Sequence, residues 1–188
     1  MTTGFSSAHQ QTTLAPGLVI HTFTATQSSH LIVHQGQALL IDCHEDQLAR
    51  QIASMNLPAP AAILQTHVQP QHCRQAGQFD QAVTYLHEGL KTLACDPAQY
   101  DRLIRTTWDD PMDWPNSMGQ ETFGVAGSVT MLPPDHPVTN VRTFNAGDVL
   151  SLIGLEFEVI PLPGHGGQFA VGFLLRKDHQ PVALFTGD

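Results

Sequence analysis

Two histidines just after a short apolar strand are the first candidates for chemistry in this chain. They are His67 and, five positions later, His72. The strand is predicted over residues 61–65, and small residues typical of a helix start follow His72. Imidazole nitrogen is a common metal ligand, so the pair could bind a metal ion. The chain has 11 histidines, however, so this pair alone is weak evidence for a metal site.

Polar residues also follow the ends of three other predicted strands. Asp42 ends an apolar strand, His165 lies in a glycine-rich turn after another, and Asp188 follows the strand predicted over residues 182–186. Side chains at the ends of neighbouring strands can converge on one pocket. Histidine and carboxylate side chains are suitable metal ligands, and a carboxylate can bridge two ions. The order of these strand ends therefore predicts a metal site.

This ordered set resembles the metallo-β-lactamase superfamily, from about residue 17 to residue 188. That family places Thr-His-x-His-x-Asp-His at such a strand end, where this chain has Thr-His-Val-Gln-Pro-Gln-His from Thr66 to His72. The resemblance implies an α/β fold, a four-layer αββα sandwich with the metal site at one edge between the sheets. It also implies a hydrolase in which a metal-bound hydroxide attacks an ester, thioester or amide.

The resemblance assigns a role to each matching residue. The matches to metal ligands are His67, His72, His165 and Asp188. Asp42 matches the acidic residue that supports the site. Gln69 falls on the second histidine of the motif and Gln71 on its aspartate, and a neutral amide is a poor zinc ligand that accepts no proton. We therefore expect zinc as one ion or none rather than two, and we assign no catalytic base.

Three further features each allow two interpretations. His44 stands near the expected site, where the family has glycine, and is either a replacement ligand or, as we favour, part of a solvated turn. Cys73 follows His72 at a helix start, which lowers the pKa of a thiol. It is either a reactive thiolate or, as we favour, a small buried residue. Apolar bulk over residues 105–125 forms either a wall of the substrate pocket or a separate small core.

The remaining pattern predicts one domain over residues 16–188, preceded by a polar, flexible leader over residues 1–15. Periodicity predicts a hairpin that turns at Gln35 and Gly36, a helix over 48–55, and hairpins over 149–162 and 169–186. Residues 109–140 predict a long irregular loop. An apolar strand that runs into the last residue predicts that the C-terminal part of the domain is absent. The resemblance implies the same, because the family's last histidine ligand would lie beyond Asp188.

Composition excludes several partners. The formal net charge of −9 opposes binding to nucleic acid or to an anionic membrane surface. No apolar run reaches the roughly 20 residues of a membrane span, and the N-terminus lacks the pattern of a secretory signal. The three cysteines have no metal-binding spacing and predict reduced thiols. We expect a cytoplasmic protein with a small-molecule substrate or ligand, and the sequence leaves its oligomeric state open.

Three function classes remain. In the first, the protein is a metal-dependent hydrolase with an altered metal site and weak activity. In the second, it is a non-catalytic relative that uses the pocket to bind a small molecule or a partner. In the third, it is purely structural and has no affinity for metal.

Overall fold

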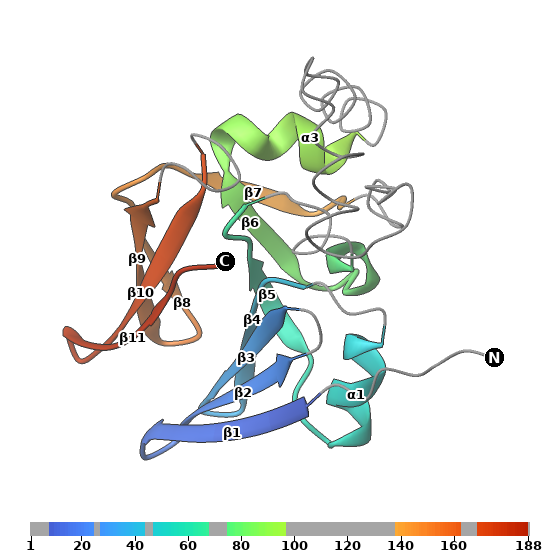
Figure 1. The fold of residues 1–188 in the computed structure, drawn as a ribbon, viewed down its shortest axis with the longest axis vertical. Coiled ribbons are helices and arrows are strands. Elements are labelled where there is room, and N and C mark those ends of the chain that lie inside the picture. Colours follow the sequence, from blue (N-terminus) through green and yellow to red (C-terminus); the bar gives the residue numbers. More distant parts are fainter. Residues whose placement is uncertain are drawn as a thin grey trace, which may run out of the picture.

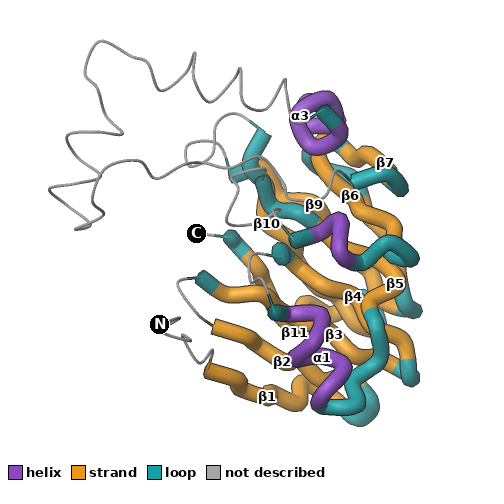
Figure 2. The backbone as a smooth tube through the Cα atoms, turned by 90° about the vertical axis from the view of Figure 1, so that its right-hand side faces the viewer, coloured by secondary structure: helices purple, strands orange, loops and turns teal. Residues whose placement is uncertain are grey.

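Two β-sheets face one another in this protein (Figure 1). The computed structural model describes residues 8–24, 27–43, 47–67, 75–96, 138–162 and 169–187. Figure 2, turned by a right angle, shows the strands stacked along the sheets with short helices beside them. Across these described residues, no helix is long and apolar enough to cross a membrane.

The larger sheet has seven strands in the order of the sequence. They are β1 (Ala8–Ala15), β2 (Leu18–Thr24), β3 (Ser28–His34), β4 (Gln37–Ile41), β5 (Pro60–Leu64), β6 (Val83–His87) and β7 (Val141–Phe144). Neighbouring strands are antiparallel from β1 to β4 and parallel from β4 to β7. The carboxyl ends of β4, β5, β6 and β7 therefore lie at one edge of the sheet, where side chains from separate strands can meet.

Short helical segments connect the parallel strands. They are α1 (Leu48–Ser54), η1 (Ala76–Gln78), η2 (Glu88–Leu90) and α3 (Lys91–Cys95). Leu48 and Ile52 of α1 are buried against Phe23, Leu31 and Ile63 on one face of the larger sheet. Leu48 and Ile52 are four positions apart and so lie on one face of α1, which confirms the predicted helix.

The smaller sheet has four antiparallel strands in the order β11, β10, β9, β8. They are β8 (Val149–Leu152), β9 (Leu155–Pro161), β10 (Val171–Lys177) and β11 (Gln180–Phe185). In β9, Leu155, Phe157 and Val159 are buried and alternate with Glu156 and Glu158, which are partly exposed. This period of two is that of a strand with one face on a core, and it confirms the predicted hairpins.

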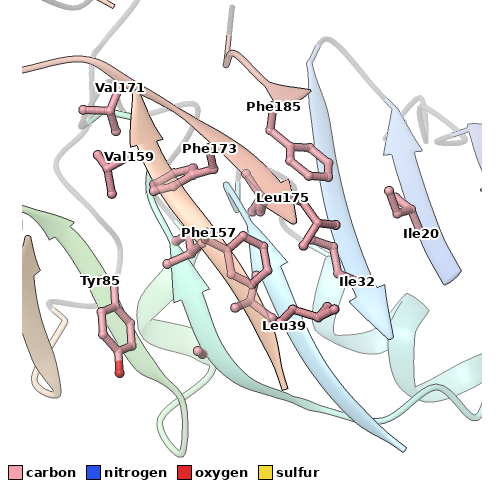
Figure 3. Close-up of a cluster of buried hydrophobic side chains, with 14 of the residues drawn as sticks. Ile20, Ile32, Leu39, Tyr85, Phe157, Val159, Val171, Phe173, Leu175 and Phe185 are labelled. Atoms are coloured by element: carbon pink, nitrogen blue, oxygen red, sulfur yellow. The ribbon is translucent and has the colours of Figure 1, made fainter. Parts of the chain in front are cut away.

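The main core lies between the two sheets. Figure 3 shows Phe157, Phe173 and Phe185 of the smaller sheet directed towards Ile32 and Leu39 of the larger one. All five side chains are buried. Since apolar burial contributes about 1.5–3 kcal/mol for each large side chain, this layer holds the two sheets together. It also fixes the strand ends of one sheet relative to those of the other.

A buried histidine adds a polar link between the sheets. The β8–β9 hairpin turns at Ile153 and Gly154, whose φ angles of 49° and 73° are those of a type I′ turn. The ring of His34, at the end of β3, lies 2.9 Å from the Ile153 carbonyl oxygen through Nδ1. Since a carbonyl only accepts, Nδ1 donates the proton. The hairpin predicted at Gln35 and Gly36 has the same turn geometry, with φ angles of 51° and 77°.

Part of the predicted leader is a strand. Residues 8–15 were expected to be flexible, whereas β1 forms an antiparallel ladder with β2 along its length. The prediction failed because the first six residues of β1 are exposed, so the strand carries no alternation of apolar and polar residues. Its pairing rests on backbone hydrogen bonds, with a bulge between Thr13 and Ala15. The short edge strand β7 was not predicted either.

We predict that His34→Ala lowers the free energy of unfolding by about 1–3 kcal/mol, because a partly buried hydrogen bond to the Ile153 carbonyl is lost. Urea denaturation measures the change. His179→Asn is the matched control, since the His179 side chain is 86% exposed at the β10–β11 turn and asparagine tolerates its φ of +62°. Its effect should stay within about 0.5 kcal/mol. Equal effects of the two substitutions would refute a structural role for His34.

Candidate metal centre

The centre is built on Asp42, the first residue after β4. Asp42 has a φ of +54°, a left-handed conformation that aspartate tolerates better than most residues. Its backbone nitrogen donates to the carbonyl oxygen of Leu64 at 3.0 Å, which fixes it beside the end of β5. The side chain is only 2% exposed. A carboxylate placed here needs hydrogen-bond donors from the protein.

Thr66 supplies two such donors. Its backbone nitrogen donates to Asp42 Oδ1 at 2.9 Å, and its hydroxyl donates to Asp42 Oδ2 at 2.8 Å. Hydrogen bonds to a carboxylate are stronger than those between neutral groups, and both carboxylate oxygens are engaged by one residue. The end of β5 is therefore held to the end of β4 by side-chain as well as by ladder contacts.

The same hydroxyl sets the protonation of His67. Thr66 Oγ1 lies 2.9 Å from His67 Nδ1. The single hydroxyl proton goes to Asp42, which only accepts, so Oγ1 must accept the proton that His67 carries on Nδ1. In the neutral ring the lone pair is then on Nε2, and this atom is buried. A neutral imidazole in this tautomer can ligate a metal through Nε2.

Two segments from the smaller sheet meet the larger sheet at Thr66. The backbone nitrogen of Val171, at the start of β10, donates to the Thr66 carbonyl oxygen at 2.9 Å. The backbone nitrogen of Leu162 donates to the Ala170 carbonyl oxygen at 3.0 Å. The start of β10 is thus held beside Thr66, and His165 itself lies outside the described residues.

The residue before Asp188 also lies against Thr66. Gly187, with a φ of +74°, lies so close that a Cβ atom there would be 2.8 Å from Thr66 Oγ1. A side chain at this position would clash with the hydroxyl that joins Asp42 to His67. Asp42, His67 and Gly187 therefore all lie against Thr66.

Most of the predicted ligands lie outside the described residues. This applies to His72, His165 and Asp188, to the doubtful positions His44, Gln69 and Gln71, and to Cys73 and residues 105–125. Their roles stay predictions. In the described part of the chain, no group of three or more histidine, cysteine, aspartate or glutamate side chains is placed to hold a metal ion.

Sequence reasoning missed two residues at this edge. Thr66 was identified as part of the motif, but its bonds to Asp42 and His67 were not expected. His87, the last residue of β6, stacks on the ring of Phe169 with centroids 4.9 Å apart, and its Nδ1 accepts from the nitrogen of Gly89 at 3.1 Å. The rule that found Asp42, a polar residue at the end of an apolar strand, would also have found His87.

A cavity of about 440 Å³ lies beside Asp42, lined by residues that include Thr22, His30 and Phe185. His30 Nδ1 lies 3.0 Å from the Thr22 hydroxyl. Burial lowers the pKa of His30 below its ordinary value, and the negative charge of Asp42 partly offsets this effect.

Comparison with known proteins identifies the fold. No family model and no curated protein matches the chain by sequence. Among solved structures, it is similar to the subclass B3 metallo-beta-lactamase MEM-A1 from a soil metagenome library, with a TM-score of 0.62 and 18% identity over 96% of this chain and 63% of that one. FEZ-1 from Legionella gormanii has a TM-score of 0.64 and 13% identity, over 95% and 63% of the two chains.

The chain has the metallo-β-lactamase fold. This confirms the predicted fold class. A third similar structure is a metallo-beta-lactamase from Cronobacter sakazakii described by a HARLDQ motif, with a TM-score of 0.56 and 19% identity. The match covers 88% of this chain and 59% of that one. The present chain therefore spans about 60% of the length of these structures.

We predict that Thr66→Val destabilises this metallo-β-lactamase fold by about 2–3 kcal/mol. Valine has a similar shape but cannot donate to Asp42 or accept from His67, so a buried charge loses a hydrogen bond. Thr66→Ser is the matched control because it keeps the hydroxyl, and it should cost about 1 kcal/mol for the lost methyl group. Urea denaturation separates the two. The role given to the hydroxyl is wrong if serine costs as much as valine.

We also predict that stability falls as the pH decreases below about 6.5, partly through His30. Its pKa is lower in the folded protein than the ordinary 6.5, so the unfolded chain binds a proton first as the pH drops. Stability is lost until folded His30 also protonates. Burial also lowers the pKa of His21, so the test compares His30→Gln with the unchanged protein in urea denaturation at about pH 7.5 and 5.5. His30→Gln should lose less stability between these two pH values than the unchanged protein, whereas His179→Gln should lose as much as the unchanged protein. If His30→Gln loses as much stability as the unchanged protein, His30 does not contribute to the pH dependence.

Proposed function

We propose that this protein is a metal-dependent hydrolase of the metallo-β-lactamase fold, with a single zinc ion, low turnover, and an ester, thioester or amide as substrate. The observation that carries the proposal is the chain of hydrogen bonds from Asp42 through the Thr66 hydroxyl to His67 Nδ1. A metal-ligating histidine commonly donates its other ring N–H to an oxygen that is itself held in place. Here that arrangement leaves the Nε2 of His67 as the ligating atom.

The donor set fits one zinc ion better than two. Besides His67, the proposed donors are His72, His165 and Asp188. Three imidazoles and one carboxylate match the ligands of a mononuclear zinc site, in which three protein ligands leave one position open in a catalytic centre. We take the ligands of the single ion from these four side chains and assign no catalytic base. When bound, zinc would act as a Lewis acid that polarises the substrate carbonyl.

The two glutamines are the reason to expect low turnover. Gln69 gives a weak neutral oxygen where the motif has an imidazole, and Gln71 cannot accept a proton or offset positive charge. The similar Cronobacter sakazakii structure supports an altered motif on this fold, since HARLDQ has arginine at the third letter and glutamine at the sixth. In this chain the third and fifth letters are glutamine. These substitutions also favour a second candidate, a non-catalytic protein that binds a small molecule in the same pocket.

We predict about one equivalent of zinc in the full chain purified without chelator, because the proposed donors fill a single site. His67→Gln should lose this zinc, whereas His179→Gln, altered at an exposed turn, should retain it. Elemental analysis by mass spectrometry gives the ratio, and circular dichroism confirms that each variant is folded. Absence of zinc from the folded protein under zinc-replete conditions would remove the hydrolase proposal.

A second prediction concerns the combined substitution Gln69→His and Gln71→Asp. Restoring an imidazole and a proton acceptor should raise kcat/KM for ester or thioester hydrolysis about a hundredfold, within the usual range for a general base. Gln69→Asn with Gln71→Asn is the control that keeps neutral amides. Hydrolysis by the natural chain that increases in the double variant supports a weak hydrolase. If only the double variant hydrolyses the substrate, the natural chain is not a hydrolase and the non-catalytic candidate is favoured.

A further inference from the structure

Two histidines on neighbouring strands meet at the edge of the larger sheet, away from the candidate metal centre. His9 of β1 and His21 of β2 approach to 3.1 Å between Nε2 and Nδ1. Their ring centroids are 5.3 Å apart and the ring planes are inclined by 14°. The β1–β2 register places Gln11 opposite His21 and Phe23 opposite His9, so the two histidines are diagonal neighbours on one face.

This face is not the one that carries the candidate centre. Along β2, His21 shares its side with Phe23, which packs in the core beneath α1. Ile20 lies on the other side and belongs to the core between the sheets. The histidine pair and the Asp42 region are therefore separated by the thickness of the larger sheet.

The two nitrogens lie within reach of one chelated metal ion. A metal–imidazole bond is about 2.0–2.1 Å long, so two such bonds at close to a right angle place their nitrogens about 3 Å apart. In the metal-free protein a proton between the two rings accounts for the same contact. The rings point at each other along this contact, since their nitrogens are 3.1 Å and their centroids 5.3 Å apart. The exposed His9 side chain must therefore move by about 2 Å to direct its lone pair at an ion bound to His21 in place of that proton. His21 is buried and holds one of the two nitrogens fixed.

We propose that His9 and His21 form a second metal site, which takes a divalent transition-metal ion of the nickel or copper class. Imidazole is a suitable ligand for these ions, and their affinity for nitrogen ligands rises from nickel to copper. Two protein nitrogens hold the ion and water completes its coordination on the exposed side. The ion joins β1 to β2, and β1 is an edge strand whose first six residues are exposed.

Calorimetric titration of the metal-free full chain with Ni²⁺ tests the site. The unchanged protein should bind one more equivalent of Ni²⁺ than His9→Gln, or bind that equivalent at least tenfold more tightly. Ni²⁺ should also raise the Tm of the unchanged protein more than that of His9→Gln, since an ion that binds the folded state stabilises it. His9→Gln alters an exposed residue and is expected to fold, and His21→Gln provides the second variant.

The control is His179→Gln, which removes an exposed histidine from the smaller sheet and should leave Ni²⁺ binding unchanged. Equal stoichiometry, affinity and Tm shift in His9→Gln and the unchanged protein would overturn the proposal. Because the comparison concerns the equivalent that His9→Gln removes, its result does not depend on whether the candidate centre beside Asp42 binds metal.

Discussion

The buried carboxylate of Asp42 is the constraint on which the candidate centre depends. A charge with 2% exposure must be met by donors, and Thr66 meets it with its backbone nitrogen and its hydroxyl. The hydroxyl then has one role left, which is to accept from His67. One buried charge thus determines the position of the β5 end and the tautomer of the histidine that follows it.

The fold brings the other segments to the same place. Parallel pairing from β4 to β6 puts the ends of these strands at one edge, and the core between the sheets fixes the smaller sheet beside them. The Thr66 carbonyl oxygen accepts from Val171, and the Thr66 side chain leaves room for a glycine, but not for a larger residue, at position 187. Thr66 therefore contacts three strand ends that are far apart in the sequence. Because of this convergence, a substitution at Thr66 would disturb the contacts to all three strand ends.

The sequence was sufficient to predict the apolar strands, their hairpins and the polar residues at their ends. Alternation in β9 and helical spacing in α1 result from burial on one face, and burial leaves a pattern in the residues. Strand β1 leaves no such pattern, because its polar residues are held by backbone hydrogen bonds. The role of Thr66 could not be predicted either, since it depends on the left-handed backbone of Asp42 and on contacts from the second sheet. His87 also follows an apolar strand, but its contact with Phe169 joins segments far apart in the sequence, and this contact leaves no local pattern.

The central claim is that Asp42, acting through Thr66, fixes His67 as the Nδ1–H tautomer with its lone pair on Nε2. Nitrogen NMR of the histidine rings in the metal-free protein near neutral pH tests it most directly, with the His67 signals assigned by their loss in His67→Gln. The account predicts a protonated, pyrrole-type Nδ1 and an unprotonated, pyridine-type Nε2 for this ring. The opposite tautomer, with the proton on Nε2, would contradict it.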